Sequence, residues 1–292
     1  MVRPAQFGFN AETANTNIFQ NAISADDLST IQGKALKEFD DFVKVLRDHK
    51  IYVIVLQDPG KPFTPDSIFP NNWISFQDEN LILFPMLAEN RRRERRSNWI
   101  SLLKNAFHIH NVIDFSGYEK QAQFLEGTGS LVLDRINRTA YANISSRTNE
   151  EVLKAFALKM KFELVYFGSK SPEGKEIYHT NVLMAIGEKT AVICSEIIRD
   201  EAARKQVIAQ LSAHHEIVEI NYDQLLQFAG NMLLLKNRDE EKFWVMSENA
   251  FRSLNPSQIE VLRKDGAFIY SGLDTIETIG GGSARCMMCE VI

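Results

Sequence analysis

A cysteine near the C-terminal end of the chain is the residue best suited to chemistry. Cys286 follows the glycine run 280–282 and stands directly after Arg285. Glycines let the backbone approach a bound group closely, and a neighbouring guanidinium favours the thiolate, which is the nucleophilic form of cysteine. The pattern therefore predicts a thiol that attacks a flat electrophilic carbon. The alternative is a buried cysteine that only packs.

An internal repeat supplies the elements that would position this thiol. Hydrophobic alternation and turn residues recur with a period of about 50–57 residues, in the order strand, tight turn, strand, helix, strand. Four copies are predicted within the chain, with their first strands at 72–76, 129–133, 181–185 and 231–235. A fifth copy is assembled from both ends of the chain, with its first strand at 286–292, its helix at 26–47 and its last strand at 51–56.

Five such units joined through the termini predict a closed α/β ring, which leaves no unpaired sheet edge. The polar residues Asn72, Glu126, His179 and Cys286 each fall at or just before the first strand of a unit. Equivalent positions in a ring converge on its axis, so residues far apart in the sequence would meet in one pocket. Chance similarity among alternating strands and helices is the alternative to this interpretation.

Four short segments, taken in order, resemble one group of enzymes. They are the run from Asp66 to Trp73, Glu126-Gly127-Thr128-Gly129, His179-Thr180-Asn181 and the terminal run that ends in Cys286. With them the chain resembles the guanidino-group modifying enzymes of the pentein superfamily, which includes arginine deiminases, dimethylarginine dimethylaminohydrolases and amidinotransferases. The resemblance implies a single pentein domain over residues 1–292. Its implied fold is a five-bladed α/β propeller of ββαβ repeats with pseudo-fivefold symmetry, whose fifth unit is closed by both termini.

The resemblance also implies a catalytic set. Cys286 matches the nucleophile, His179 the general acid and base, and Glu126 the carboxylate that positions substrate nitrogen. The residue types suit these roles, because a thiolate adds to a planar carbon and an imidazole protonates the departing amine before it activates water. Taken alone, His179 is typical of a half-buried structural histidine and Glu126 of a residue that enters a hairpin.

Three further positions resemble residues that hold the substrate. Asp66 matches an aspartate of the substrate-binding loop. Arg92, in an Arg-Arg-x-Glu pattern, and Arg147, in Ser-Arg-Thr-Asn, resemble the arginines that bind the amino acid's carboxylate in the dimethylarginine enzymes. A guanidinium fork matches a carboxylate in two hydrogen bonds, which supports that role. The alternative for the arginine run 91–96 is the solvated first turn of a helix.

Two asparagines depart from the family pattern and bear on the substrate. Arginine deiminases have aspartates where this chain has Asn72 and Asn181, and the dimethylarginine enzymes have one at the position of Asn72. A buried guanidinium without its counter-carboxylates is costly, whereas a neutral ureido group suits the donors and acceptors of an amide. The two amides therefore favour citrulline or a similar ureido compound. Asparagine as a simple turn former is the alternative.

The composition narrows the class of protein further. A net charge of −5 over 292 residues argues against nucleic acid or an anionic membrane as a partner. The sequence has no apolar run of about 18 residues that would predict a transmembrane helix. Three cysteines and a start without an apolar leader indicate a reducing compartment, so we expect a cytoplasmic protein. The expected partner is a small amino-acid substrate, and a homodimer stays open.

We expect neither a metal nor an organic cofactor. Cys286 and Cys289 have the CxxC spacing, but a structural zinc needs a second ligand pair at comparable spacing, which His214-His215 does not provide. Cys289 either packs or forms a regulatory disulfide with Cys286. The glycines at 127 and 129 lack the third glycine and the lysine of a nucleotide site.

Together these observations predict a hydrolase of the amidinotransferase family that depends on a catalytic cysteine. It would cleave a C–N bond of a ureido or guanidino amino acid through a covalent thiolate adduct, with citrulline as the leading substrate. Amidino transfer and hydrolysis of arginine or dimethylarginine are the alternatives among enzymes. A binding protein that keeps the ring but has lost turnover is the alternative outside them.

Overall fold

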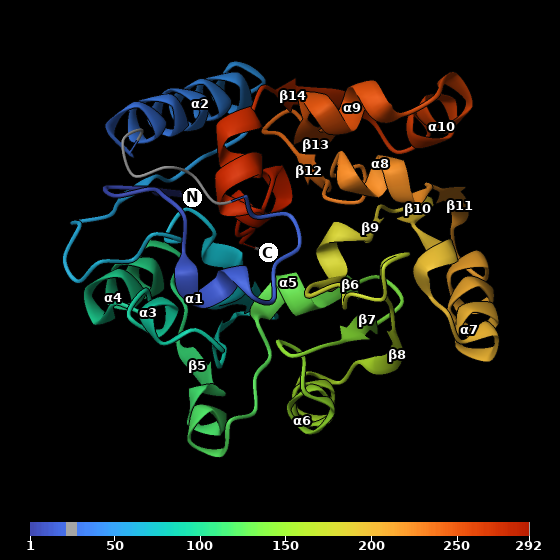
Figure 1. Ribbon diagram of the computed structural model, residues 1–292, viewed down its shortest axis with the longest axis horizontal. Helices are drawn as coiled ribbons and strands as arrows, with labels where there is room; N and C mark the ends of the chain where they lie inside the picture. Colours follow the sequence, from blue (N-terminus) through green and yellow to red (C-terminus); the bar gives the residue numbers. More distant parts are fainter. Residues whose placement is uncertain (22–27, 292) are drawn as a thin grey trace.

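The computed structural model describes residues 1–21 and 28–291 of the chain. Four three-stranded sheets share one construction: an antiparallel hairpin and a third strand that pairs in parallel with the second strand of the hairpin. Figure 1 shows these units around the middle of the molecule, with helices on the outside. In chain order the strands are β3 (Ile74–Gln77), β4 (Asn80–Leu83) and β5 (Asn111–Asp114); β6 (Leu131–Asp134), β7 (Thr139–Ile144) and β8 (Glu163–Gly168); β9 (Met184–Ile186), β10 (Thr190–Ile193) and β11 (Glu216–Glu219); β12 (Leu233–Lys236), β13 (Lys242–Ser247) and β14 (Ala267–Ser271).

Helices return the chain from the second strand of each unit to the third, as parallel pairing requires. Side-chain caps fix several of their starts: Asn149 accepts hydrogen bonds from the backbone N–H groups of Glu151 and Val152, and Asn255 forms a capping box with Gln258. The predicted order of elements is therefore present in four units. The connecting helices are α3 (Glu89–Arg92) and α4 (Ser97–Ala106), α6 (Glu150–Met160), α7 (Glu201–Ser212), and α9 (Glu248–Ser253) with α10 (Pro256–Leu262). Shorter turns elsewhere are α8 (Tyr222–Leu226), η3 (Ser116–Gln121) and η5 (Ser195–Ile197).

The first strand of each unit begins two or three residues later than predicted. In three units the residues before it form a short helical turn: η2 (Pro70–Asn72), α5 (Gly127–Ser130) and η4 (Thr180–Val182). Tertiary contacts explain these turns, because they contact one another near the middle of the molecule, where α5 packs on both η2 and η4. The polar residues predicted to converge therefore lie on or beside turns at the inner ends of the strands.

The strand assignments of the fifth unit were wrong. The predicted strand at 286–292 is instead the turn η7 (Ala284–Met287), followed by residues 288–291 without strand structure, while Ile292 lies outside the described residues. The predicted strand at 51–56 is reduced to β2 (Leu56–Gln57), which pairs in a parallel register with the N-terminal β1 (Val2–Arg3). The predicted helix is present as α2 (Leu28–Asp48) and packs on β14, although residues 26 and 27 lie outside the described residues.

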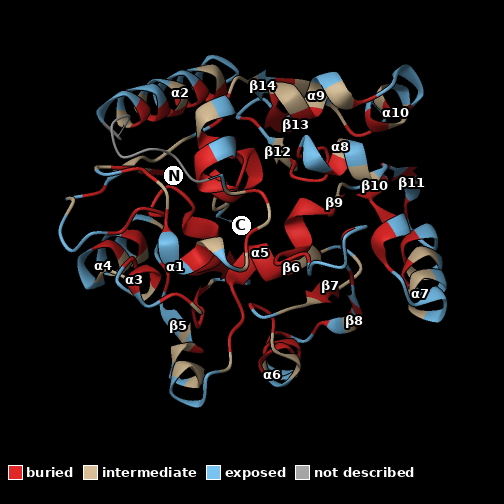
Figure 2. Cartoon of the chain, viewed as in Figure 1, coloured by how far each residue is buried: buried red, intermediate tan, exposed pale blue. Residues whose placement is uncertain are grey.

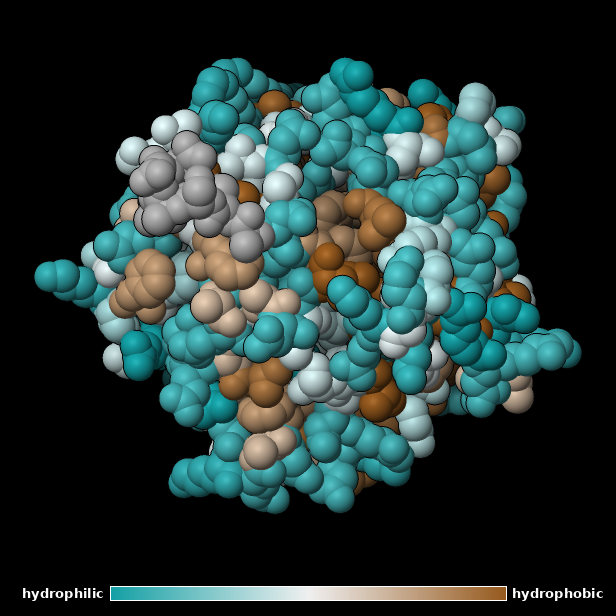
Figure 3. All heavy atoms as spheres, in the orientation of Figure 1, coloured by the Kyte–Doolittle hydropathy of each residue, from teal (hydrophilic) through white to brown (hydrophobic). Residues whose placement is uncertain are grey.

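The apolar faces of the helices pack inward. Along α2, the buried residues Phe39, Phe42 and Leu46 recur at helical spacing and join the core beside β14. Figure 2 shows buried residues gathered in the middle and exposed residues on the outer helix faces, and the face in Figure 3 is mostly hydrophilic with apolar groups near its centre. Among the described helices, even the 21-residue α2 lacks the apolar character that a bilayer crossing requires.

Candidate active site

The predicted nucleophile, base and carboxylate lie together. Glu126 precedes α5, His179 precedes η4 and Cys286 belongs to η7, and their exposed fractions are only 1%, 2% and 3%. Cys286 and His179 line one small pocket, and Glu126 contacts His179 from behind it. Three segments that are more than 50 residues apart in the sequence therefore converge, as the repeat predicted.

Two glycines allow this approach. At Gly127 the backbone has a φ of +47°, and a Cβ atom would lie 2.2 Å from the carbonyl oxygen of Asn71. A Cβ atom at Gly129 would lie 2.4 Å from Asn72 Nδ2 and 2.7 Å from His179 Nδ1. Any side chain at these positions would displace the His179 imidazole or the neighbouring backbone and amide groups, which explains why the segment reads Glu-Gly-Thr-Gly.

The histidine and the glutamate form a buried pair. His179 Nε2 and Glu126 Oε2 are 2.9 Å apart. Burial opposes the charge of Glu126, but the Arg147 guanidinium and the bond from His179 outweigh it and lower the pKa of this carboxyl to about 2. Burial lowers the pKa of His179 to about 4, against the opposite effect of Glu126. At neutral pH an ionised carboxylate thus accepts Nε2–H of a neutral imidazole, whose Nδ1 is left to take a proton.

Arg147 is bound to the same carboxylate and to the N-terminal segment. Its Nη1 lies 3.5 Å from Glu126 Oε2, while Nη2 donates to the carbonyl oxygen of Thr13 at 3.1 Å and to Thr16 Oγ1 at 2.7 Å. The guanidinium also stacks over the Tyr178 ring, with 4.6 Å between its central carbon and the ring centroid. Arg147 therefore lines the pocket, and all three of its guanidinium nitrogens have protein partners, since Nε also donates to Thr16 Oγ1 at 3.1 Å.

The surroundings of Cys286 differ from the sequence-based expectation. The Arg285 guanidinium does not reach the thiol, because it donates to the carbonyl oxygen of Met288 at 2.9 Å and to Glu290 at 3.1 Å. Two side-chain amides contact the sulfur instead: Asn181 Nδ2 at 3.5 Å and Asn231 Nδ2 at 3.3 Å. The effect predicted for Arg285 was wrong, because its side chain turns toward the following residues.

Sequence reasoning missed Asn231, although a signal for it existed. Asn231 is fully buried and stands two residues before β12, the first strand of the fourth unit. Asn72 stands two residues before β3 in the first unit. The repeat that singled out Asn72, Glu126, His179 and Cys286 therefore has an equivalent polar residue in its fourth copy.

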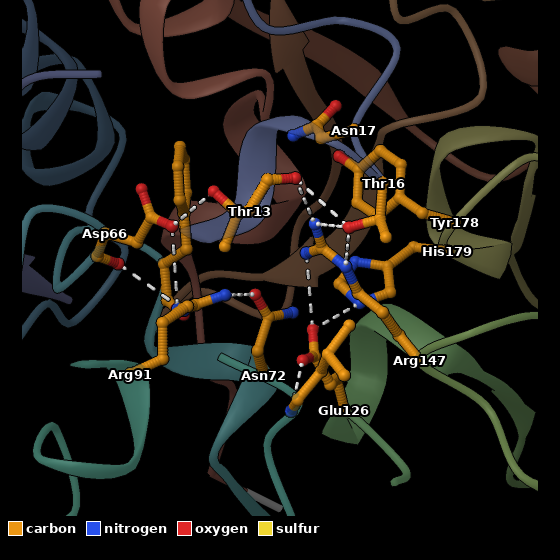
Figure 4. A network of polar contacts seen from close by, with 12 residues as sticks. Thr13, Thr16, Asn17, Asp66, Asn72, Arg91, Glu126, Arg147, Tyr178 and His179 are labelled. Carbon is orange, nitrogen blue, oxygen red and sulfur yellow. Dashed lines mark hydrogen bonds and ion pairs between the residues drawn. The ribbon is translucent and has the colours of Figure 1, made fainter. Parts of the chain in front are cut away.

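A second network lies across the pocket, around Arg91 (Figure 4). Arg91 donates to Glu94 at 2.9 Å and to Asn72 Oδ1 at 2.7 Å, and its Nε is 3.8 Å from Asp66. Burial raises the pKa of Asp66 and raises that of Glu94 to about 7, and Arg91 only partly offsets this. Within the described residues, Asp66 Oδ1 and Asn72 Nδ2 have no hydrogen-bond partner.

Arg92 lies outside the pocket. Its Nε donates to the carbonyl oxygen of Met86 at 2.9 Å and its Nη2 to that of Leu87 at 3.0 Å, whereas the preceding Arg91 is buried and lines the pocket. Neighbouring residues on a helix point about 100° apart. The Arg-Arg-x-Glu pattern contains both arginines, so sequence alone could not choose between them.

Sequence reasoning also missed the segment that covers the pocket. Residues 10–21 include α1 (Ala11–Ala14), which Asn10 caps. Asn10 donates to Asp66 at 2.7 Å, and Asn17 donates to the carbonyl oxygen of Gly281 at 3.1 Å. With this segment in place the space among the side chains is small, about 10 Å³, and Asn17 forms part of its wall.

A larger cavity of about 300 Å³ lies elsewhere and is mostly apolar. It contains Cys289, whose thiol donates to the carbonyl oxygen of Ile74 at 3.4 Å, and its walls include Trp73, Phe76 and Met288. The candidate active site is the smaller pocket, because the predicted nucleophile Cys286 and His179 line that one. Cys286 and Cys289 are both free thiols here, and they line different cavities. Within residues 1–21 and 28–291 no cluster of three or more His, Cys, Asp or Glu is arranged to hold a metal ion.

Comparison with known proteins places the chain among enzymes of one kind. Residues 3–292 match the family described as "N,N dimethylarginine dimethylhydrolase, eukaryotic". No curated protein matches the chain in sequence.

Solved structures share the fold at low sequence identity. The arginine dihydrolase ArgZ from the ornithine-ammonia cycle in cyanobacteria is 15% identical with a TM-score of 0.74, and it covers all of this chain, which spans only 40% of ArgZ. The N-terminal domain of ArgZ bound to product is 15% identical with a TM-score of 0.77, and 96% of that domain is covered. A dimethylarginine dimethylaminohydrolase in an adduct with S-methyl-L-thiocitrulline is 17% identical with a TM-score of 0.63, over 88% of each chain.

Proposed function

The chain belongs to the N,N-dimethylarginine dimethylhydrolase family, within the pentein superfamily of guanidino-modifying enzymes, and we propose that it is a cysteine-dependent hydrolase whose leading substrate is citrulline. The orientation of the Asn72 side-chain amide is the observation that favours citrulline as the substrate. Because the Arg91 guanidinium has only donors, Asn72 must offer Oδ1 to it, which leaves Nδ2 as an unpartnered donor in the pocket. A ureido oxygen accepts such a hydrogen bond, whereas a guanidinium carries only donors and would leave Nδ2 unpaired.

The carboxylates of the site suit the N–H groups of the substrate's ureido group. Asp66 Oδ1 lines the pocket without a partner and suits a substrate N–H group. Glu126 stays ionised and is bound to His179, so it stabilises the imidazolium that forms during proton transfer. We assign the substrate's carboxylate to Arg147, after the cover withdraws Thr13 and Thr16 from it, and assign no substrate contact to Arg92.

The reaction follows from these positions. The Cys286 thiolate adds to the ureido carbon, and His179, having taken the thiol proton, delivers it to the nitrogen that leaves as an amine. The products of this step are an S-carbamoyl adduct and a free amine. Water then adds to the adduct while His179 accepts its proton, and the C–S bond breaks to release a carbamic acid. Decay of that acid gives carbon dioxide and the second amine, so citrulline and water yield ornithine, ammonia and carbon dioxide.

Turnover assays test this proposal. Purified protein is incubated with citrulline, arginine, and mono- or dimethylated arginine, and ammonia and ornithine are measured with Cys286→Ala as the control. We expect ornithine and ammonia in equal amounts from citrulline. Turnover of arginine or a methylated arginine without turnover of citrulline would contradict the assignment of Asn72.

Arginine dihydrolysis is a second candidate. The carboxylate of Asp66 favours it because its unpartnered Oδ1 can accept a guanidinium N–H group, and the fold is similar to that of the arginine dihydrolase ArgZ. Hydrolysis of one C–N bond of arginine produces citrulline, so such an enzyme must also accept a ureido group in its second step. Two ammonia molecules and one ornithine from each arginine would support this candidate, while accumulation of citrulline would contradict it.

We also propose that residues 1–292 form one domain, a five-bladed propeller in which α2 belongs to the fifth unit. The packing of α2 on β14 supports it. A single cooperative unfolding transition, with the same midpoint by circular dichroism and tryptophan fluorescence, is expected. Separate transitions would contradict a single domain.

A further inference from the structure

The Cys286 sulfur has no cationic hydrogen-bond partner among the described residues. Arg285 is directed to Met288 and Glu290, and His179 donates to Glu126. The titratable and charged groups that line the pocket with Cys286 are Asp66, Arg91, Arg147, Tyr178 and His179. Both arginines are engaged by carboxylates: Arg91 by Glu94 and Asp66, and Arg147 by Glu126. The side-chain nitrogens within hydrogen-bond distance of the sulfur, among the described residues, are instead those of two amides, Asn181 and Asn231.

Asn231 is fixed in the orientation that a hydrogen bond to the sulfur needs. Its Oδ1 accepts the backbone N–H of Arg285 at 3.1 Å, and its Nδ2 donates to the carbonyl oxygen of Asn181 at 2.8 Å. These two bonds determine which end of the amide carries the N–H groups. The second hydrogen on Nδ2 is then available to the sulfur, which lies at 3.3 Å, and the Asn181 amide approaches the sulfur at 3.5 Å.

We propose that Asn231 is a catalytic residue that, together with Asn181, holds Cys286 as a thiolate by donating amide hydrogen bonds to its sulfur. This inference deepens the proposed function and rests on it. A hydrogen bond to the charged form of a group favours that form, and two neutral amides do so without adding charge to the pocket.

The bonds of Asn231 also position the nucleophile. The side chain connects the backbone before Cys286 to the segment that carries His179 and Asn181, so one residue sets the distance between nucleophile and base. Asn231→Asp keeps the acceptor for Arg285 N–H but removes both donors. Asn231→Ala removes all three contacts without introducing a charge.

The pH dependence of thiol alkylation tests the proposal without any substrate. The rate of Cys286 modification by iodoacetamide is measured from pH 5 to 10 in the full chain, with the labelled cysteine identified by peptide mass spectrometry. We expect the midpoint of the rate profile to rise by about 1 pH unit in Asn231→Ala and by more in Asn231→Asp, whose carboxylate repels the thiolate. Asn237→Ala is the matched control, because Asn237 is also a buried asparagine with backbone contacts but lies in a hairpin turn away from the pocket.

The outcomes separate chemistry from structure. A higher midpoint of the alkylation rate profile in Asn231→Ala, with an unchanged midpoint in Asn237→Ala, supports the proposal. An unchanged midpoint in Asn231→Ala, or an equal rise in the control, overturns it. If the Asn231 variants do not fold, Asn181→Ala takes their place with the same expected rise. Alkylation needs no substrate, so a wild-type protein that fails to hydrolyse citrulline contradicts the proposed function while this test still gives its own answer.

Discussion

Two cysteines three residues apart lie in regions of opposite chemical character. Cys286 lies in a small polar pocket with two amides directed at its sulfur. Cys289 lies in the larger apolar cavity, where burial raises the pKa of its thiol to about 12. The CxxC spacing alone would make them equivalent. The difference shows that the surroundings of a thiol, rather than its motif, decide whether it can act as a nucleophile.

The turns η2 and η7 lie between the polar pocket and the apolar cavity. η2 places Asn72 in the pocket, while its first residue Pro70 and the following Trp73 line the apolar cavity. η7 places Cys286 in the pocket, and the chain after it places Met288 in the cavity. The apolar side therefore supports the polar side, because it packs against the backs of the turns that carry the reacting groups.

The largest expected effect is a difference in kcat between the Cys286→Ala and Cys289→Ala variants. Cys286→Ala should lower kcat by about 10⁴-fold or more, because no other nucleophile lines the described pocket. Cys289→Ala should keep kcat within a few-fold of wild type and cost only stability. Assays with citrulline, after circular dichroism has shown that both variants fold, make the measurement. Comparable losses of kcat in both variants would contradict the assignment of the chemistry to the pocket of Cys286 alone.

Truncation on the apolar side should affect stability first. Phe76 is buried on β3, lines the cavity and packs edge-on against Phe107 at 5.9 Å. Phe76→Ala is expected to reduce the free energy of unfolding by about 3–5 kcal/mol. Urea unfolding measures this, with the exposed Ile136→Ala as a control that should change it by less than about 0.5 kcal/mol. A loss below about 1 kcal/mol would mean that the cavity contributes little support to the pocket.

Charge on the polar side should change the choice of substrate. Asn72→Asp replaces the free donor by a carboxylate, so the ratio of kcat/KM for arginine to that for citrulline should rise about 100-fold. Steady-state kinetics with both substrates give the ratio. Asn80→Asp, the same substitution at the first residue of β4, is the control and should leave the ratio unchanged. An unchanged ratio in Asn72→Asp would show that Asn72 does not select the substrate.

Acid should destabilise the pocket by a smaller amount. The lowered pKa of His179 means that the unfolded chain takes up a proton below about pH 6.5, whereas the folded protein takes it up only near pH 4. The stability linked to His179 is therefore complete above pH 6.5 and is lost as the pH falls to 4. Glu94, with a raised pKa, has the opposite effect between pH 4.5 and 7.

A comparison of wild type with His179→Gln isolates the contribution of His179 to the pH dependence of stability. Between pH 6.5 and 4 wild type should lose about 1–2 kcal/mol more than His179→Gln, since Glu94 acts equally in both. Urea unfolding at pH 7, 5.5 and 4 measures the difference. Parallel pH profiles for the two proteins would contradict a neutral buried imidazole.

The sequence by itself determined the repeating units and most of the residues around the pocket. Alternating apolar residues, turn residues and helix caps act over a few positions, so the order of strands and helices can be read from neighbouring residues. Seven of the eight predicted site residues line the pocket or contact a group in it: Cys286, His179, Glu126, Asp66, Asn72, Arg147 and Asn181. Glu126 contacts His179 directly.

Only the tertiary structure decided the partners of these residues. The contact of Asn231 with Cys286 joins residues 55 positions apart, and that of Arg147 with Thr16 joins residues 131 positions apart. The same holds for Arg91 in place of Arg92, for the cover formed by residues 10–21, and for the short β1–β2 pairing in the fifth unit. The physical reason is that hydrogen bonds in a buried site form between whichever groups the closed chain brings within about 3 Å, and local patterns carry no information on that distance.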